Sequence, residues 1–133
     1  FRAPGRIEKS MTSSGKSVDA GLNSPRDVLE ALKKANLTKD IRLFMSCYSS
    51  KYKAISEKRA ATLAGWKQFN YLSLEYDLKG IIYYKEKAYS VVEWNMSVQP
   101  LDSKKAVSNQ AAYTAVLEKE ADGSWKIISL ENL

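Results

Sequence analysis

Residues 71–99 read YLSLEYDLKGIIYYKEKAYSVVEWNMSVQ, and this stretch decides the fold class. From Leu72 to Leu78 an apolar side chain stands at every second position, which is the period of a half-buried strand. Gly80 interrupts this run and predicts a β-bulge that bends a long strand. A turn at residues 85–87 leads into a second alternating run. The stretch therefore predicts two antiparallel strands that are much longer than the usual mode of about 5–6 residues.

Alternation also assigns the side chains of these two strands to an inner and an outer face. We expect the more apolar set to face inward. It comprises Leu72, Leu74, Tyr76 and Leu78 in the first strand and Ala88, Ser90, Val92, Trp94, Met96 and Val98 in the second. Glu75, Asp77 and Glu93 then lie on the outer face. If Glu93 faced inward instead, Trp94 would face outward and the carboxylate would become a candidate general base.

Two more alternating runs follow this hairpin. One covers residues 106–120 and places Tyr113, Ala115 and Leu117 on one face. The dipeptide Asp122-Gly123 is a hairpin signal. The last run extends to the end of the chain, with Trp125, Ile127 and Ser129 opposite Lys126, Ile128 and Leu130.

Upstream of residue 71 the apolar period is helical. A first helix begins with the N-cap Ser24 and ends at Asn36. A second is capped by Thr38, and a third, over residues 57–69, by Ser56. Apolar side chains recur at three- and four-residue steps in the second and third helices (Ile41, Phe44, Met45, Tyr48, Tyr52; Leu63, Trp66, Phe69).

Helices that precede a run of antiparallel strands predict an α+β fold. Because strands of this length must twist and curl, we expect a curved sheet of four long strands that wraps the three N-terminal helices in its concave face. The chain of 133 residues suits one such domain, over residues 24–133. Residues 1–23 are rich in glycine, serine and basic residues and read as a linker or N-terminal arm.

The composition excludes several kinds of site. The chain has no histidine and one cysteine, Cys47, so an intrachain disulfide and the commonest metal ligands are absent. No glycine-rich phosphate loop follows a strand. We therefore expect no metal and no cofactor, and we interpret Cys47 as a buried structural thiol. No apolar run approaches the roughly 18–20 residues that a membrane span needs.

The net charge of +6 is concentrated in residues 33–67, where nine basic residues stand against two acidic ones. A basic face can attract a polyanion, but it is more often a solvated helical surface. No nucleic-acid-binding motif accompanies it, so we do not expect nucleic acid as a partner.

The order of these elements resembles the nuclear transport factor 2-like superfamily, whose cone-shaped, cystatin-like roll is shared by ketosteroid isomerase and SnoaL-like proteins. The resemblance rests on Asp40-Ile41 with Phe44, Tyr48 and Tyr52 in the second helix, on Trp66, and on the closing hairpin LEKEADGSWKI at residues 117–127. The segment Tyr48-Ser49-Ser50-Lys51-Tyr52 is similar to that of the accessory domain in some bacterial L,D-transpeptidases and other cell-envelope proteins. The short strand usual after the second helix could come only from Lys51–Ile55.

The resemblance implies a pocket between the helices and the concave face of the sheet. Aromatic side chains could line it and stack on a ligand, or they could simply fill the core (Tyr48, Tyr52, Trp66, Tyr76, Trp94, Tyr113). It also implies a homodimer through the convex face, near Glu93, Asn95 and Gln110. The expected ligand is a small apolar molecule or a cell-envelope glycan or peptide.

No residue matches a catalytic position of the superfamily, so we expect a non-catalytic ligand-binding or assembly domain, periplasmic or secreted, with a cytoplasmic location as the alternative. A small SnoaL-like enzyme of the isomerase, cyclase or dehydratase type is a second hypothesis. In it Glu93, Asp77 or Tyr113 would supply the acid–base chemistry, and at least one carboxylate would have to lie inside the pocket. A polyanion-binding module that uses Lys33 to Lys67 is the third.

Overall fold

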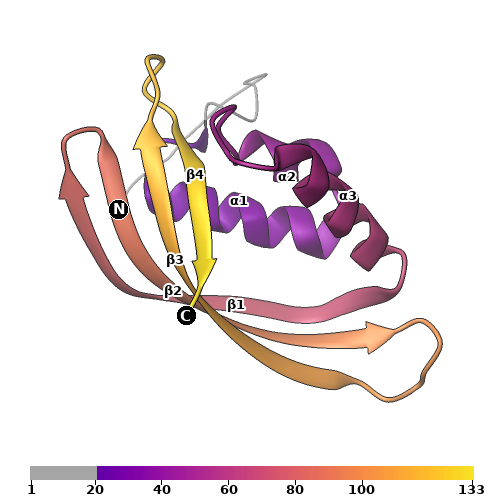
Figure 1. The fold of residues 1–133 in the computed structure, drawn as a ribbon. Helices are drawn as coiled ribbons and strands as arrows, with labels where there is room; N and C mark the ends of the chain where they lie inside the picture. The colour runs from indigo at the N-terminus through magenta and orange to yellow at the C-terminus, as the bar shows by residue number, and fades with distance from the viewer. Residues whose placement is uncertain (1–20) are drawn as a thin grey trace.

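The computed structural model describes residues 21–133, which form three helices followed by a four-stranded antiparallel sheet (Figure 1). The elements are α1 (Pro25–Thr38), α2 (Ile41–Ser46), α3 (Ile55–Trp66), β1 (Phe69–Tyr84), β2 (Lys87–Pro100), β3 (Val107–Lys119) and β4 (Trp125–Asn132). The strands are ordered β1-β2-β3-β4, which is a simple meander. The predicted α+β class is confirmed. No helix among these residues is long and apolar enough to cross a membrane.

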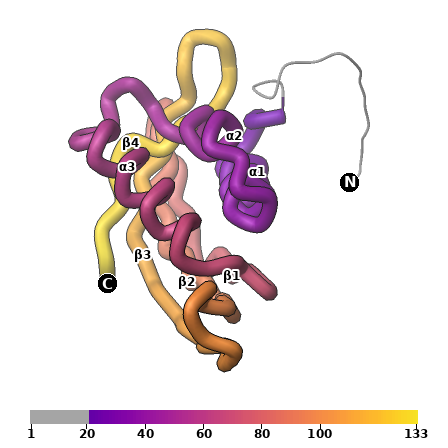
Figure 2. Tube along the Cα trace, turned by 90° about the vertical axis from the view of Figure 1, so that its right-hand side faces the viewer, coloured from indigo at the N-terminus to yellow at the C-terminus, as the bar shows by residue number. Residues whose placement is uncertain are grey.

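The sheet is strongly curved, and the three helices lie against its concave face. Figure 1 shows α1 crossing that face, and Figure 2, turned by 90°, shows the helices in front of the strands. Two β-bulges shift the register of β1 against β2, one between Tyr71 and Ser73 and one between Leu78 and Gly80. Each bulge bends the strand and increases its twist. The second is the bend that Gly80 predicts.

The first bulge corrects one sequence-based expectation. Leu72 is the extra residue there, so it leaves the inner face and is 57% exposed. Leu74, two positions later, is buried as predicted.

A third bulge corrects the expected alternation of β4. Leu117 pairs with Ile127 but Val116 pairs with Ser129, so Ile128 is the extra residue. The faces exchange at this point, and Leu130 packs against the core in the place expected for Ser129.

The first helix is longer than predicted, and the second has a different N-cap residue. Ser24 caps α1 as expected, since its Oγ accepts a hydrogen bond from the Asp27 amide at 3.1 Å. Helix α1 continues past Asn36 to Thr38, and Lys39 ends it in the left-handed conformation with φ 56°. Asp40 caps α2 through the Leu43 amide at 3.1 Å, so the prediction of a Thr38 cap was wrong.

The third helix also begins and ends earlier than predicted. Ala54 precedes it in the left-handed conformation, and Ser56 lies inside the helix and provides no cap. Phe69, which was expected in the helix, is the first residue of β1.

Helix α2 stops at Ser46 because the next residues bind to the edge of the sheet. The Ile127 amide donates to the Cys47 carbonyl, and the Ser49 amide donates to the Ile127 carbonyl, both at 2.8 Å. Tyr48 thereby forms a parallel bridge with Ile127. No strand forms at Lys51–Ile55, where the short strand was expected, and the connection pairs with the sheet through this bridge at Tyr48 instead.

The core lies between the three helices and the inner face of β2, β3 and β4, and it includes Leu22. Leu22 is 1% exposed, and its carbonyl accepts a hydrogen bond from the Trp125 amide at 2.9 Å. The domain thus includes residues just before the expected boundary at residue 24. The remainder of the expected arm, residues 1–20, lies outside the described residues.

We predict that Leu22→Ala destabilises the protein by about 2–5 kcal/mol, since it deletes a fully buried leucine side chain. Leu101→Ala is the matched control, because Leu101 is 58% exposed, and its loss should cost less than about 0.5 kcal/mol. Urea unfolding of both variants measures the two values. Equal stability of Leu22→Ala and the wild type would exclude residue 22 from the cooperative unit.

We predict that Trp66→Ala lowers the free energy of unfolding by about 3–5 kcal/mol. Trp66 is 6% exposed, packs edge-on against Phe44 with ring centroids 5.8 Å apart, and donates from Nε1 to Asn36 Oδ1 at 3.1 Å. Trp66→Phe, which keeps a ring but loses this donor, should cost less. A fully stable Trp66→Ala variant that has lost only ligand binding would make Trp66 a site residue and not a core residue.

Candidate functional site

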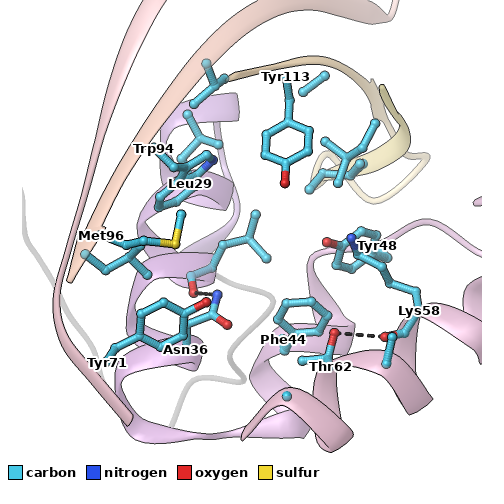
Figure 3. A pocket seen from close by; sticks show the side chains of 18 of the residues that line it. Leu29, Asn36, Phe44, Tyr48, Lys58, Thr62, Tyr71, Trp94, Met96 and Tyr113 are labelled. Carbon is cyan, nitrogen blue, oxygen red and sulfur yellow. Dashed lines mark hydrogen bonds between the residues drawn. The ribbon is translucent and has the colours of Figure 1, made fainter. Parts of the chain in front are cut away.

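A cavity of about 360 Å³ lies between the helices and the concave face of the sheet (Figure 3). Its volume is within the range of small-molecule sites. Every helix and every strand contributes at least one lining residue. The curvature of the sheet therefore creates the space, and the helices enclose it.

The cavity has an apolar floor and a more exposed side. The floor consists of buried aliphatic side chains from α1 and all four strands, among them Leu29, Leu32, Leu74, Val92, Ala115, Leu117 and Ile127. The more exposed lining residues lie on α3 and at the adjoining ends of β1 and β2, for example Ala61, Phe69 and Met96.

Four of the six aromatic residues expected at a pocket line this cavity: Tyr48, Trp66, Trp94 and Tyr113. The Tyr113 side chain points from β3 into the space (Figure 3). Tyr48 reaches the cavity from the residues that bridge to β4. Their role in binding remains a prediction.

The other two aromatic residues are not among the lining residues. Tyr52 packs edge-on against Tyr48, with ring centroids 4.9 Å apart. Tyr76 packs against Trp94 at 5.2 Å, and its hydroxyl donates to Glu30 Oε2 of α1 at 2.5 Å. Both side chains support lining residues from outside the cavity.

Several lining residues were not expected from the sequence, namely Asn36, Phe44, Lys58, Thr62, Phe69 and Tyr71. The helical period places Phe44 on an inner face but says nothing of a cavity there. Tyr71 lies one residue before the bulge at Leu72, so simple alternation puts it on the wrong face. Lys58 lies in the basic segment and reads as a surface residue.

The polar groups of the cavity are hydroxyls, one amide and one ammonium. Burial raises the pKa of Tyr48 and of Tyr71, so both phenols stay protonated at neutral pH and can donate hydrogen bonds. Asn36 is already engaged, since Nδ2 donates to the Leu32 carbonyl at 2.9 Å and Oδ1 accepts from Trp66. Thr62 Oγ1 donates to the Lys58 carbonyl at 2.8 Å.

Lys58 brings the ammonium group into this apolar environment. It lies in the first turn of α3, and its Nζ is 5.9 Å from the centroid of the Tyr48 ring. Partial burial lowers the pKa of the ammonium, because desolvation disfavours the charged form. Figure 3 shows the side chain extending from α3 to the side of Tyr48.

No aspartate or glutamate is among the lining residues. Asp77 and Glu93 lie directly opposite each other on the outer face, and Lys79 Nζ lies 3.0 Å from Asp77 Oδ2 and 3.7 Å from Glu93 Oε1. Alternation predicts this outward position. Of the three acid–base candidates in the enzyme hypothesis, only Tyr113 reaches the cavity.

The convex face carries the residues expected at a dimer contact. Asn95 and Gln110 are exposed and directly opposite each other on β2 and β3, and Gln110 Nε2 donates to Asn95 Oδ1 at 3.0 Å. Glu93 lies two positions away on the same face.

The basic residues of the segment 33–67 serve different parts of the fold. Lys33 pairs with Glu75 and Lys51 with Glu118, each at 2.8 Å. Lys39 Nζ donates to the Trp66 carbonyl at 2.6 Å and so ties the end of α1 to the end of α3. Only Lys33 and Lys51 of this segment pair with carboxylates of the described residues, and most of its basic residues are exposed.

Cys47 is fully buried, and its Sγ lies 3.5 Å from the Leu43 carbonyl oxygen. Within residues 21–133 no group of three or more acidic or cysteine side chains could hold a metal ion.

Comparison with known proteins finds no family model and no curated protein that matches this sequence. Solved structures do match. A conserved protein from Planctomyces limnophilus superposes with a TM-score of 0.71 at 12% identity, covering 81% of this chain and 94% of that one. A ketosteroid isomerase-like protein from Erwinia carotovora gives a TM-score of 0.62 at 17% identity, over 84% and 92% of the two chains.

A nuclear transport factor 2-like superfamily protein from Salmonella enterica gives a TM-score of 0.63 at 11% identity, over 87% and 89% of the two chains. Identities this low show the fold alone. With its three helices in the concave face of a curved four-stranded sheet, this protein has the fold of the nuclear transport factor 2-like superfamily.

Proposed function

We propose that this protein is a non-catalytic binding domain for a small, largely apolar molecule. The observation that carries the proposal is the cavity of about 360 Å³, which has an aliphatic floor and aromatic walls. Tyrosine and tryptophan side chains offer an apolar body and a polar tip, which suits the binding of a ring with few polar groups.

The lining residues favour binding over catalysis. General acid–base chemistry needs a group that can give and take a proton near neutral pH. The chain has no histidine, and the lining residues include no carboxylate. A catalytic role would depend on Tyr113 and Lys58. Turnover of a small apolar ketone by the wild type, lost in Tyr113→Phe, would support the enzyme alternative.

We propose further that two copies associate through the convex face of the sheet. The outer face of β1 and β2 carries exposed apolar side chains at Ile82 and Tyr89, and the amide pair Asn95–Gln110 continues the same face. The ion-paired Asp77, Lys79 and Glu93 lie between these two pairs, and exposed apolar side chains among polar groups are typical of protein interfaces. The resemblance to envelope accessory domains leads us to propose a periplasmic or secreted location.

We predict that Val92→Phe abolishes binding of the neutral fluorescent probe N-phenyl-1-naphthylamine, which the wild type should bind. Val92 is a buried lining residue, so a larger ring there occupies the cavity. Val91→Phe is the matched control, because alternation directs it to the outer face. Fluorescence titration should show at least a tenfold loss for Val92→Phe and none for Val91→Phe. Failure of the wild type to bind any apolar probe would refute the proposed function.

We predict a dimer in sedimentation equilibrium and a monomer after the double substitution Asn95→Arg, Gln110→Arg. Each copy contributes both positions to a symmetric contact, so the new charges repel across it. Ala64→Arg on the exposed side of α3 is the control and should remain dimeric. A wild type that stays monomeric at high concentration contradicts this part of the proposal.

A further inference from the structure

Lys58 places a positive charge at an apolar cavity. It is half-buried, and it lines the cavity together with Tyr48, Phe44 and Leu117. Buried or partly buried ammonium groups are usually paired with a carboxylate, since an uncompensated charge loses hydration without a substitute. Lys58 is therefore expected to have a carboxylate partner.

Four lysines of the described residues have such a partner. Lys33, Lys51, Lys79 and Lys87 each lie within 4.0 Å of a carboxylate oxygen. Lys58 has no ion pair with any carboxylate of residues 21–133, and no acidic residue lines the cavity. Its ammonium group lies over the face of the Tyr48 ring, at 5.9 Å from the centroid.

The surrounding donors are directed at the same space. The Tyr113 side chain points into the cavity from the opposite side, and Tyr48 lies beside Lys58 (Figure 3). The raised pKa of Tyr48 keeps its hydroxyl a donor. An ammonium and two phenols supply hydrogen-bond donors, and no described side chain supplies a carboxylate acceptor for them.

We propose that the ligand of this cavity is an apolar molecule with one carboxylate group, which forms an ion pair with Lys58. The inference rests on the proposed binding function and specifies the chemical class of its ligand. The apolar body would occupy the space between Trp94, Tyr113 and the aliphatic floor. Charge-assisted hydrogen bonds are stronger than neutral ones, and a partly dehydrated site strengthens them further.

The test compares naphthalene-2-carboxylate with the isosteric, neutral naphthalene-2-carboxamide by isothermal titration calorimetry at pH 7. We expect the wild type to bind the carboxylate at least tenfold more tightly. In Lys58→Met the carboxylate should lose at least tenfold in affinity, and the carboxamide should bind as before, because only the charge contact is removed. Lys53→Met, which removes an exposed lysine outside the cavity lining, is the control and should bind like the wild type.

A second variant separates charge from packing. Lys58→Arg keeps the cation and should retain the preference for the carboxylate. Thermal unfolding should show Lys58→Met at least as stable as the wild type, since it replaces a partly dehydrated ammonium by an apolar group. This measurement excludes misfolding as the cause of lost affinity.

Each outcome has a distinct meaning. Equal affinity of the wild type for both probes, or a carboxylate preference that survives in Lys58→Met, overturns the inference and leaves the binding function intact. If neither probe binds to the wild type and N-phenyl-1-naphthylamine does not bind either, the proposed function itself is wrong and the inference falls with it.

Discussion

The arrangement of this domain depends on the two backbone hydrogen bonds that Ile127 makes with Cys47 and Ser49. A helix that continued through these residues would leave the amide and carbonyl of Ile127 without these partners, at a cost comparable to lost hydrogen bonds in a buried site. The chain instead leaves the helix at Ser46 and joins the edge of β4. This turn directs Tyr48 into the cavity and starts the connection that leads to α3. Lys58 reaches the ring of Tyr48 only because of that path.

The curvature of the sheet is the second condition for a cavity. Strands of 16, 14 and 13 residues in β1, β2 and β3 would form a flatter surface if their register were regular. The bulges in β1 and β4 bend these strands toward the helices. The helices contact the sheet around a space and do not fill it. The β-bulges of the long strands thus determine both the curvature of the sheet and the presence of the cavity.

The sequence predicts the strands and most of their inner face, because alternation is a local property. Gly80 also reveals its bend, since a glycine in a strand is a local signal. The bulges at Leu72 and Ile128 carry no such signal, because they depend on the register with a partner strand. For the same reason Tyr71 and Leu130 could not be assigned to the inner face from the sequence.

The sequence predicts an aromatic-lined cavity between helices and sheet, but it does not predict all of the residues that line it. Alternation and helical period pointed correctly to Trp66, Trp94 and Tyr113, whereas Tyr48, which was expected in a helix, reaches the cavity from the bridge to β4. Depth along an element is a tertiary property, so Tyr52 and Tyr76 could not be distinguished from these four. The sequence did not predict Lys58 as a lining residue for another reason. A lysine in a basic segment gives the same sequence pattern whether its side chain is solvated or lines a cavity.

The bulges of β1 also affect how this protein behaves toward other chains. β1 is an edge strand of the sheet, and among the described strands only β2 pairs with its backbone. A long regular edge of this kind offers unpaired amides and carbonyls that a second chain can extend into an aggregate. Here the two bulges break the edge into short regular pieces, and Lys79 adds a charge at the second of them. The irregularities that shape the cavity therefore also make this edge a poor template for a second chain.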